Sequence, residues 1–86
     1  MTIVDFPNLT TFPEWIKQLT SLQRIQIIKC PNLTSLPNGL RSVKCLEYLE
    51  IVGCPRLKKR CEKEIGEDWP KITHVRYFFN KPDLGE

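Results

Sequence analysis

Four cysteines and one histidine are the residues whose chemistry could make this chain an enzyme or a metal protein. No Cys-x-x-Cys pair occurs among Cys30, Cys45, Cys54 and Cys61, although structural zinc sites usually take closely spaced ligand pairs. Cys61 with His74 is the only conceivable nucleophile–base pair, and the sequence lacks a Gly-rich phosphate loop and a recognisable Ser/His/Asp arrangement. We therefore expect no catalysis, no metal and no cofactor, and thiols that are reduced and mostly buried.

The charge pattern contains one basic run, Lys58-Lys59-Arg60, in a chain of 86 residues with a net charge of +3 at pH 7. Such a run can contact nucleic acid or an anionic membrane. Here Glu62, Glu64, Glu67 and Asp68 follow at once and cancel most of its field, and no aromatic residues are interleaved to stack on bases. We expect a solvated face beside a helix and no nucleic-acid partner.

The sequence also argues against membrane insertion and secretion. No apolar run approaches the roughly 20 residues that span a bilayer. The N-terminus has neither a basic region nor a long apolar core, so we predict no signal peptide and a cytoplasmic location. The sequons at Asn8 and Asn32 arise from one repeated Pro-Asn-Leu-Thr turn and are expected to carry no glycan.

A repeat of 24 residues runs from the first residues to about Leu57. Ile3-Val-Asp-Phe-Pro-Asn-Leu9 aligns with Ile27-Ile-Lys-Cys-Pro-Asn-Leu33 and with Ile51-Val-Gly-Cys-Pro-Arg-Leu57. A fixed period in this range is typical of a solenoid, in which each unit buries its apolar face against its neighbours. About two and a half repeats occupy residues 1–57.

Each period contains two kinds of apolar spacing. Alternation at Ile25/Ile27 and at Leu49/Ile51 predicts strands with one buried face. A spacing of three and four then predicts a short α- or 3₁₀-helical return that faces inward, at Leu33, Leu36, Leu40 and Val43.

Cys30 and Cys54 lie where the chain would leave two successive strands. Their thiols could donate weak hydrogen bonds to backbone carbonyls of the turn. They could equally be small buried apolar groups, and the sequence does not separate these two readings.

The tail departs from the repeat. Leu57, Cys61 and Ile65 recur every four residues and predict a short helix that Gly66 ends. Trp69-Pro-Lys-Ile72 with Val75 suggests a degenerate last strand, whose outward positions would be Ile72, His74 and Arg76 if the period continued. We therefore divide this part into a capping helix and last strand at 58–78 and a loose tail at 79–86.

The spacing Leu22-x-x-Ile25-x-Ile27-x-x-Cys30-x-x-Leu33 resembles the leucine-rich-repeat signature. The Cys-Pro-x-Leu continuation, the following Leu-Pro-x-x-Leu and the tail from Cys54 to His74 resemble the repeat end of plant coiled-coil-type nucleotide-binding leucine-rich-repeat disease resistance proteins. The resemblance implies an α/β leucine-rich-repeat solenoid. Its parallel strands would form the concave face, with short helical or irregular convex returns and a C-terminal cap.

The same resemblance implies a non-enzymatic recognition module: the final repeats of an intracellular immune receptor. Its partner would be a pathogen effector, a guarded host protein or the receptor's own nucleotide-binding domain, which the repeats help to hold inactive. No nucleotide would bind this part of the receptor. The alternative is a short stand-alone repeat protein acting as an adaptor or decoy.

The expected protein-binding residues are the outward strand positions. Arginine and aromatic residues often anchor protein interfaces, although exposed strand positions favour aromatic and β-branched residues in any case. The candidates are Arg24, Gln26, Ile28, Tyr48, Glu50 and Val52.

The first layer of the stack has no preceding Leu-x-x-Leu segment to cover it. We expect this layer to expose apolar side chains, and we interpret the chain as the C-terminal piece of a longer receptor. The side chains concerned are Ile3, Phe6, Leu9 and Trp15.

Overall fold

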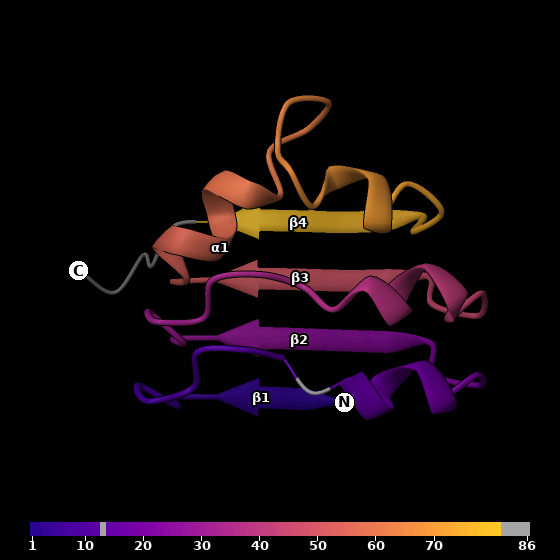
Figure 1. Cartoon of the computed structure of the whole chain (residues 1–86), viewed down its shortest axis with the longest axis horizontal. Helices are drawn as coiled ribbons and strands as arrows, with labels where there is room; N and C mark the ends of the chain where they lie inside the picture. Colours follow the sequence, from indigo (N-terminus) through magenta and orange to yellow (C-terminus); the bar gives the residue numbers. More distant parts are fainter. Residues whose placement is uncertain (13, 82–86) are drawn as a thin grey trace.

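The computed structural model describes residues 1–12 and 14–81. They form a four-stranded parallel sheet in the order β1-β2-β3-β4, which follows the chain (Figure 1). The strands are β1 (Thr2–Val4), β2 (Arg24–Ile28), β3 (Tyr48–Val52) and β4 (Tyr77–Lys81).

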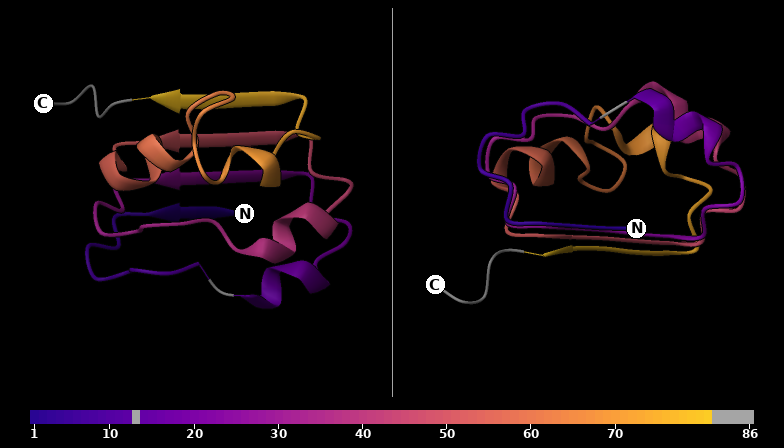
Figure 2. Two further views of the ribbon diagram at one scale, coloured as in Figure 1. Left: turned by 45° about the horizontal axis from the view of Figure 1, so that its top comes forward. Right: turned by 90° about the horizontal axis from the view of Figure 1, so that it is seen from below.

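Short helical pieces connect the strands, and all of them lie on one side of the sheet (Figure 2). Three are 3₁₀ helices and one is an α-helix, so the chain has an α/β repeat fold. None of the helices in the described part of the chain is long and apolar enough to cross a membrane. The pieces are η1 (Glu14–Gln18), η2 (Asn38–Ser42), α1 (Pro55–Arg60) and η3 (Trp69–Lys71).

The sequence period is also the structural period over the first three strands. Ile3 pairs with Ile27, and Ile27 pairs with Ile51, so that each strand lies directly beside the strand 24 residues away. Seen along the stack, the first coils lie almost on top of one another (Figure 2, right). Neighbouring returns are joined as well, because the N–H and the Oγ1 of Thr34 both donate to the carbonyl oxygen of Thr10 at 3.1 Å.

The core lies between the sheet and the returns. The inward strand residues Ile25, Ile27, Leu49 and Ile51 are fully buried, which confirms the predicted strands. The return residues predicted to face inward are buried too, and they join the strand residues in one apolar cluster. They are Leu33, Leu36, Leu40 and Val43.

Each of the first three strands is followed by a residue with left-handed backbone geometry. Asp5, Lys29 and Gly53 have φ angles of 59°, 55° and 68° and stand one period apart. Glycine adopts this conformation without steric cost, aspartate tolerates it, and lysine loses about 1 kcal/mol there. The same left-handed turn therefore follows each of the first three strands, although three different residue types occupy the position.

The buried thiols of Cys30 and Cys54 donate hydrogen bonds to backbone carbonyls, which was one of the two interpretations that the sequence left open. The Sγ of Cys30 donates to the carbonyl of Ile28 at 3.6 Å, and the Sγ of Cys54 donates to that of Val52 at 3.5 Å. The Cys54 Sγ also accepts the N–H of Cys30 at 3.4 Å. Cys61 is buried as well and Cys45 is exposed, all four thiols being free.

The helix of the tail is shorter than predicted. Helix α1 ends at Arg60, where Cys61 remains buried. Ile65 is 77% exposed, so its predicted place on an apolar helical stripe is wrong. A tight loop replaces the next helical turn: Glu64 has a left-handed φ of 69°, and the N–H of Gly66 closes the loop by donating to the Glu62 carbonyl at 2.8 Å.

The predicted position of the last strand is also wrong. Residues Trp69–Lys71 form η3, and Ile72 is buried. Strand β4 begins at Tyr77 and pairs with β3 at an offset of 29 residues (77 − 48), five more than the period. The loop after α1 accounts for these five additional residues.

Two further expectations are wrong because β4 pairs with β3 in this shifted register. The outward positions of the last strand are Tyr77, Phe79 and Lys81, and they are not Ile72, His74 and Arg76. Residues 79–81 belong to β4 and are not a loose tail. The rest of that predicted tail, 82–86, lies outside the described residues.

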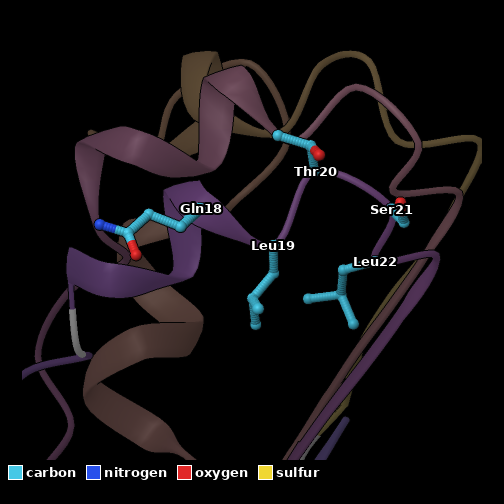
Figure 3. Close-up of a pocket in the computed structure, with 5 residues that line it drawn as sticks. All are labelled: Gln18, Leu19, Thr20, Ser21 and Leu22. Carbon is cyan, nitrogen blue, oxygen red and sulfur yellow. The ribbon is translucent and has the colours of Figure 1, made fainter.

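The first coil exposes two of the four apolar side chains that were predicted to be exposed. Phe6 and Trp15 are 54% and 52% exposed, whereas Ile3 and Leu9 are half-buried. Residues 18–22 of this coil line a hollow, in which Leu19 and Leu22 point toward the interior of the coil (Figure 3).

Candidate protein-interaction surface

One face of the sheet carries no helical return, and we call it the open face (Figure 2, right). Successive side chains of a strand point to opposite faces, so every second residue of each strand lies here. The open face consists of Thr2, Val4, Arg24, Gln26, Ile28, Tyr48, Glu50, Val52, Tyr77, Phe79 and Lys81.

A row of polar contacts crosses the middle of the open face. Thr2 Oγ1 donates to Gln26 Oε1 at 3.2 Å, and Gln26 Nε2 donates to Glu50 Oε1 at 2.9 Å. Glu50 Oε2 then lies 3.7 Å from the Nζ of Lys81. These contacts link side chains of all four strands across the open face.

Aromatic and cationic side chains gather toward the N-terminal ends of β2, β3 and β4, with Phe79 two residues further along β4. The guanidinium carbon of Arg24 lies 4.7 Å from the ring centroid of Tyr48, and the Tyr48 and Phe79 rings are 5.5 Å apart. Tyr77 and Phe79 are 52% and 38% exposed. We call Arg24, Tyr48, Tyr77 and Phe79 the aromatic corner.

The aromatic corner borders a hollow. It is lined by residues at the N-terminal ends of three neighbouring strands and by the residues just before two of them: Gln23, Arg24, Glu47, Tyr48 and Tyr77. Tyr48 and Tyr77 give this hollow aromatic walls, and Gln23, Arg24 and Glu47 give it polar groups.

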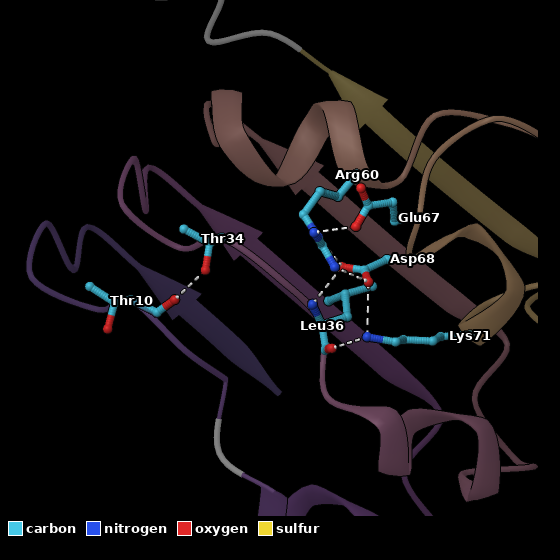
Figure 4. Close-up of polar contacts among 7 residues, drawn as sticks. All are labelled: Thr10, Thr34, Leu36, Arg60, Glu67, Asp68 and Lys71. Atoms are coloured by element: carbon cyan, nitrogen blue, oxygen red, sulfur yellow. Dashed lines mark hydrogen bonds and ion pairs between the residues drawn. The ribbon is translucent and has the colours of Figure 1, made fainter.

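A second cluster of charged residues lies on the other side of the sheet, where the tail meets the second return (Figure 4). Asp68 is 0% exposed, and its carboxylate accepts the N–H of Leu36 at 2.9 Å. It also accepts two guanidinium bonds from Arg60 at 3.1 and 3.2 Å and lies 2.8 Å from the Nζ of Lys71. Lys71 donates in turn to the carbonyl of Leu36 at 2.6 Å. We call Arg60, Asp68, Lys71 and the backbone of Leu36 the ion cluster.

The ion cluster favours the ionised forms of Asp68 and Arg60. Burial by itself would raise the pKa of Asp68, but the hydrogen bonds from Arg60, Lys71 and the Leu36 amide outweigh it, and the pKa lies below its ordinary value. The hydrogen bond to Asp68 raises the pKa of Arg60. A carboxylate with this many donors stabilises the fold in its ionised form.

Next to this cluster, the buried Cys61 thiol makes stability sensitive to alkali. Burial, helped by the charge of Asp68, raises the pKa of Cys61 to about 12 from 9.0. Since the unfolded thiol ionises first, the stabilisation is present below about pH 9 and falls by about 1.4 kcal/mol per pH unit as pH rises toward 12. Urea titrations between pH 8 and 11, expressed as the free energy of unfolding, measure this loss; Cys61→Ala should have a flatter alkaline limb. Parallel alkaline limbs in the two proteins would contradict the assignment.

The sequence itself was compared with known proteins. Residues 2–54 match the sequence model of the R13L1/DRL21 leucine-rich-repeat family, which is more than half of the chain. The chain belongs to this family. Searches among curated proteins and among solved structures found no match.

Membership of the R13L1/DRL21 family makes these repeats leucine-rich repeats of the plant resistance type. Modules of this kind generally mediate protein–protein interaction and are typically not enzymes. The structure adds a physical argument against Cys61 with His74, because a nucleophile must reach its thiolate form and the raised pKa of Cys61 opposes that. His74 Nε2 instead lies 3.1 Å from the carbonyl oxygen of Val43.

All six candidate binding residues of this R13L1/DRL21 chain lie on the open face, and the structure brings four of them together in pairs. Arg24 contacts Tyr48, and Gln26 contacts Glu50. Ile28 and Val52 stand side by side at the other end of β2 and β3. That these residues bind a partner stays a prediction.

Three open-face residues were missed by the sequence reasoning: Tyr77, Phe79 and Lys81. They lie beyond the segment that matches the R13L1/DRL21 repeats. The run Tyr77-Phe78-Phe79 was the available signal, because aromatic residues favour strands.

Proposed function

We propose that this chain is a non-enzymatic protein-recognition module that forms the final leucine-rich repeats of a cytoplasmic plant immune receptor of the coiled-coil nucleotide-binding class. Its partner is a pathogen effector or a guarded host protein. The observation that carries the proposal is the open face, where exposed aromatic and arginine side chains are already held by their neighbours. Rigid aromatic and arginine anchors are the residues that most often dominate protein interfaces.

The proposed architecture is a solenoid whose concave side is the open face and whose end is closed by residues 58–81. The in-register parallel stack with its 24-residue step supports the solenoid. The attachment of Asp68 and Lys71 to the backbone of Leu36 supports the closing role, because it satisfies polar groups that a further coil would otherwise meet.

The exposed side chains of the first coil support contact with another part of the receptor. Phe6, Trp15 and the hollow around Leu19 and Leu22 form an apolar surface on the β1 side of the stack. We propose that a preceding leucine-rich coil covers it, and that the same array helps to hold the receptor's nucleotide-binding domain inactive.

The test compares two variants of the chain by proximity labelling in plant cells. The first replaces Arg24, Gln26, Tyr48 and Glu50 of the open face by alanine. The second, a control, replaces the exposed return residues Arg41 and Lys44. We expect the proteins labelled by the unmodified chain to be lost from the open-face variant and kept by the control. Equal labelling by both variants would remove the open face from the proposal.

The same open-face substitutions should be made in the receptor that carries these repeats. Recognition and resting inhibition should then change, with circular dichroism of the isolated chain confirming that the variant stays folded. Unchanged recognition together with unchanged inhibition would contradict a role of this face in sensing.

A further inference from the structure

We infer that the aromatic corner binds a short acidic segment of the partner protein, with one apolar side chain in the hollow and a carboxylate on Arg24. This inference rests on the proposed recognition function and assigns it a chemistry and a place. The place includes Tyr77 and Phe79 of β4, which lie outside the segment that matches the repeat family.

The aromatic corner exposes the rings of Tyr77 and Phe79. Tyr77 lies next to Tyr48 across the β3–β4 register, and Phe79 packs against Tyr48 and under the Nζ of Lys81, 5.1 Å from the ring centroid. Because the Tyr48 and Phe79 rings already contact neighbouring side chains, a partner that packs on them costs little additional side-chain entropy. Exposed, preorganised aromatic surface favours an apolar anchor.

The charges on the open face favour an acidic partner. The open face carries Arg24 and Lys81 against Glu50, a formal charge of +1 (2 − 1). Glu50 lies near Lys81, whereas within residues 1–12 and 14–81 no carboxylate forms an ion pair with Arg24. The Arg24 guanidinium stacks on Tyr48, which leaves its N–H groups available for a bidentate carboxylate.

Glu47 also lines the hollow, together with Arg24 and Tyr48. Its negative charge repels a carboxylate inside the hollow, whereas an apolar side chain meets no such repulsion there. The partner's carboxylate must therefore lie over the sheet, on Arg24, while its apolar side chain enters between Tyr48 and Tyr77.

The experiment uses the whole chain and three fluorescein-labelled peptides built on a glycine–serine scaffold. One carries a central tryptophan flanked by glutamates, one carries the tryptophan flanked by lysines, and one carries the glutamates without tryptophan. Fluorescence anisotropy measures the affinities. We expect the acidic tryptophan peptide to bind about tenfold or more tightly than either of the others, because one charged hydrogen-bonded contact and one aromatic anchor are each worth about that factor.

Matched variants locate the site. Arg24→Glu should abolish the preference for the acidic peptide, and Tyr77→Ala should weaken its binding about tenfold. Arg41→Glu makes the same charge change at an exposed position of η2 and should leave the affinity unchanged. Circular dichroism before each titration verifies that the variants are folded, and amide shifts in NMR spectra should concentrate at Arg24, Tyr48 and Tyr77.

Several results would overturn the inference. Equal affinity for the acidic and the basic peptide, or loss of affinity in Arg41→Glu to the same extent as in Arg24→Glu, would exclude an acid-selective corner. Self-association of the chain that disappears in Arg24→Glu would show a second copy as the occupant. If the peptides show no acid preference while the open-face variant loses its labelled partners in cells, this inference fails and the proposed function stands.

Discussion

Replacing Asp68 by alanine should lower the free energy of unfolding by about 3–5 kcal/mol, because removing one partner of a buried ion pair leaves an uncompensated charge. The fully buried Asp68 carboxylate accepts hydrogen bonds from the Leu36 amide and from Arg60, and forms an ion pair with Lys71. Lys71 stays buried after the substitution and keeps only the carbonyl of Leu36 as a partner. At about 0.05–0.15 kcal/mol per residue, a chain of 86 residues has a total stability of about 4–13 kcal/mol, so this loss removes a large share of it.

Urea denaturation followed by far-UV circular dichroism measures the effect. Glu67→Ala is the matched control, since it removes an exposed carboxylate that pairs with the same Arg60 and should cost no more than about 1 kcal/mol. The double variant Asp68→Leu with Lys71→Met should recover much of the stability, because apolar replacement of a buried ion pair is often neutral or stabilising. Equal losses in Asp68→Ala and Glu67→Ala would show that the ion cluster does not hold the tail.

Replacing Gly66 by alanine should destabilise the chain by about 3 kcal/mol, at the upper end of the usual cost of overpacking. A Cβ at this position would stand 2.2 Å from the carbonyl oxygen of Arg60 and 2.6 Å from the backbone nitrogen of Glu62. Both contacts are backbone atoms, so no side-chain rotation relieves them. The loop must open, which also displaces Asp68, whose N–H donates to the same Arg60 carbonyl at 2.7 Å.

Thermal and urea unfolding of Gly66→Ala test this expectation, and hydrogen exchange of the Leu36 amide reports whether the ion cluster loosens. Glu64→Gly is the control in the same loop. It replaces a residue with a φ of 69° by one that adopts this geometry freely, so it should be neutral or slightly stabilising. An unfolding midpoint of Gly66→Ala equal to that of the unmodified chain would contradict the steric argument.

The repeated part of this fold was predictable because its contacts join equivalent residues one period apart. Ile27 lies beside Ile3 and Ile51, and Thr34 bonds to Thr10, so the pattern in one period specifies the pairing of the next. The spacing alone predicted the strand positions and the inward-facing leucines. It also offered hydrogen bonds from the cysteine thiols as one of two interpretations.

The tail was not predictable, because its decisive contacts obey no period. Asp68 and Lys71 both reach the backbone of Leu36, over 32 and 35 residues. In the sequence these charges look like an ordinary solvated run, and their burial depends on a loop that spacing does not reveal. The extra five residues of that loop shift β4, and with it the outward positions at Tyr77, Phe79 and Lys81.

The candidate surface was likewise predictable in its periodic part and not in the part that β4 contributes. The six sequence-derived residues lie on the open face because they belong to periodic strands. The aromatic corner needs β4, and the packing of Phe79 on Tyr48 follows only from the shifted register. Sequence reasoning thus located the face but not its most exposed aromatic part.

The attachment of the tail to Leu36 has a consequence for how such proteins diversify. The two groups that Asp68 and Lys71 engage are a main-chain N–H and C=O, which a return of this shape offers whatever its side chains are. Duplication, loss or recombination of whole 24-residue blocks would therefore change the outward-facing residues while leaving a docking point for the tail. Divergence of the outward-facing residues and retention of the same tail are compatible in this fold, because the tail bonds to main-chain groups and not to particular side chains.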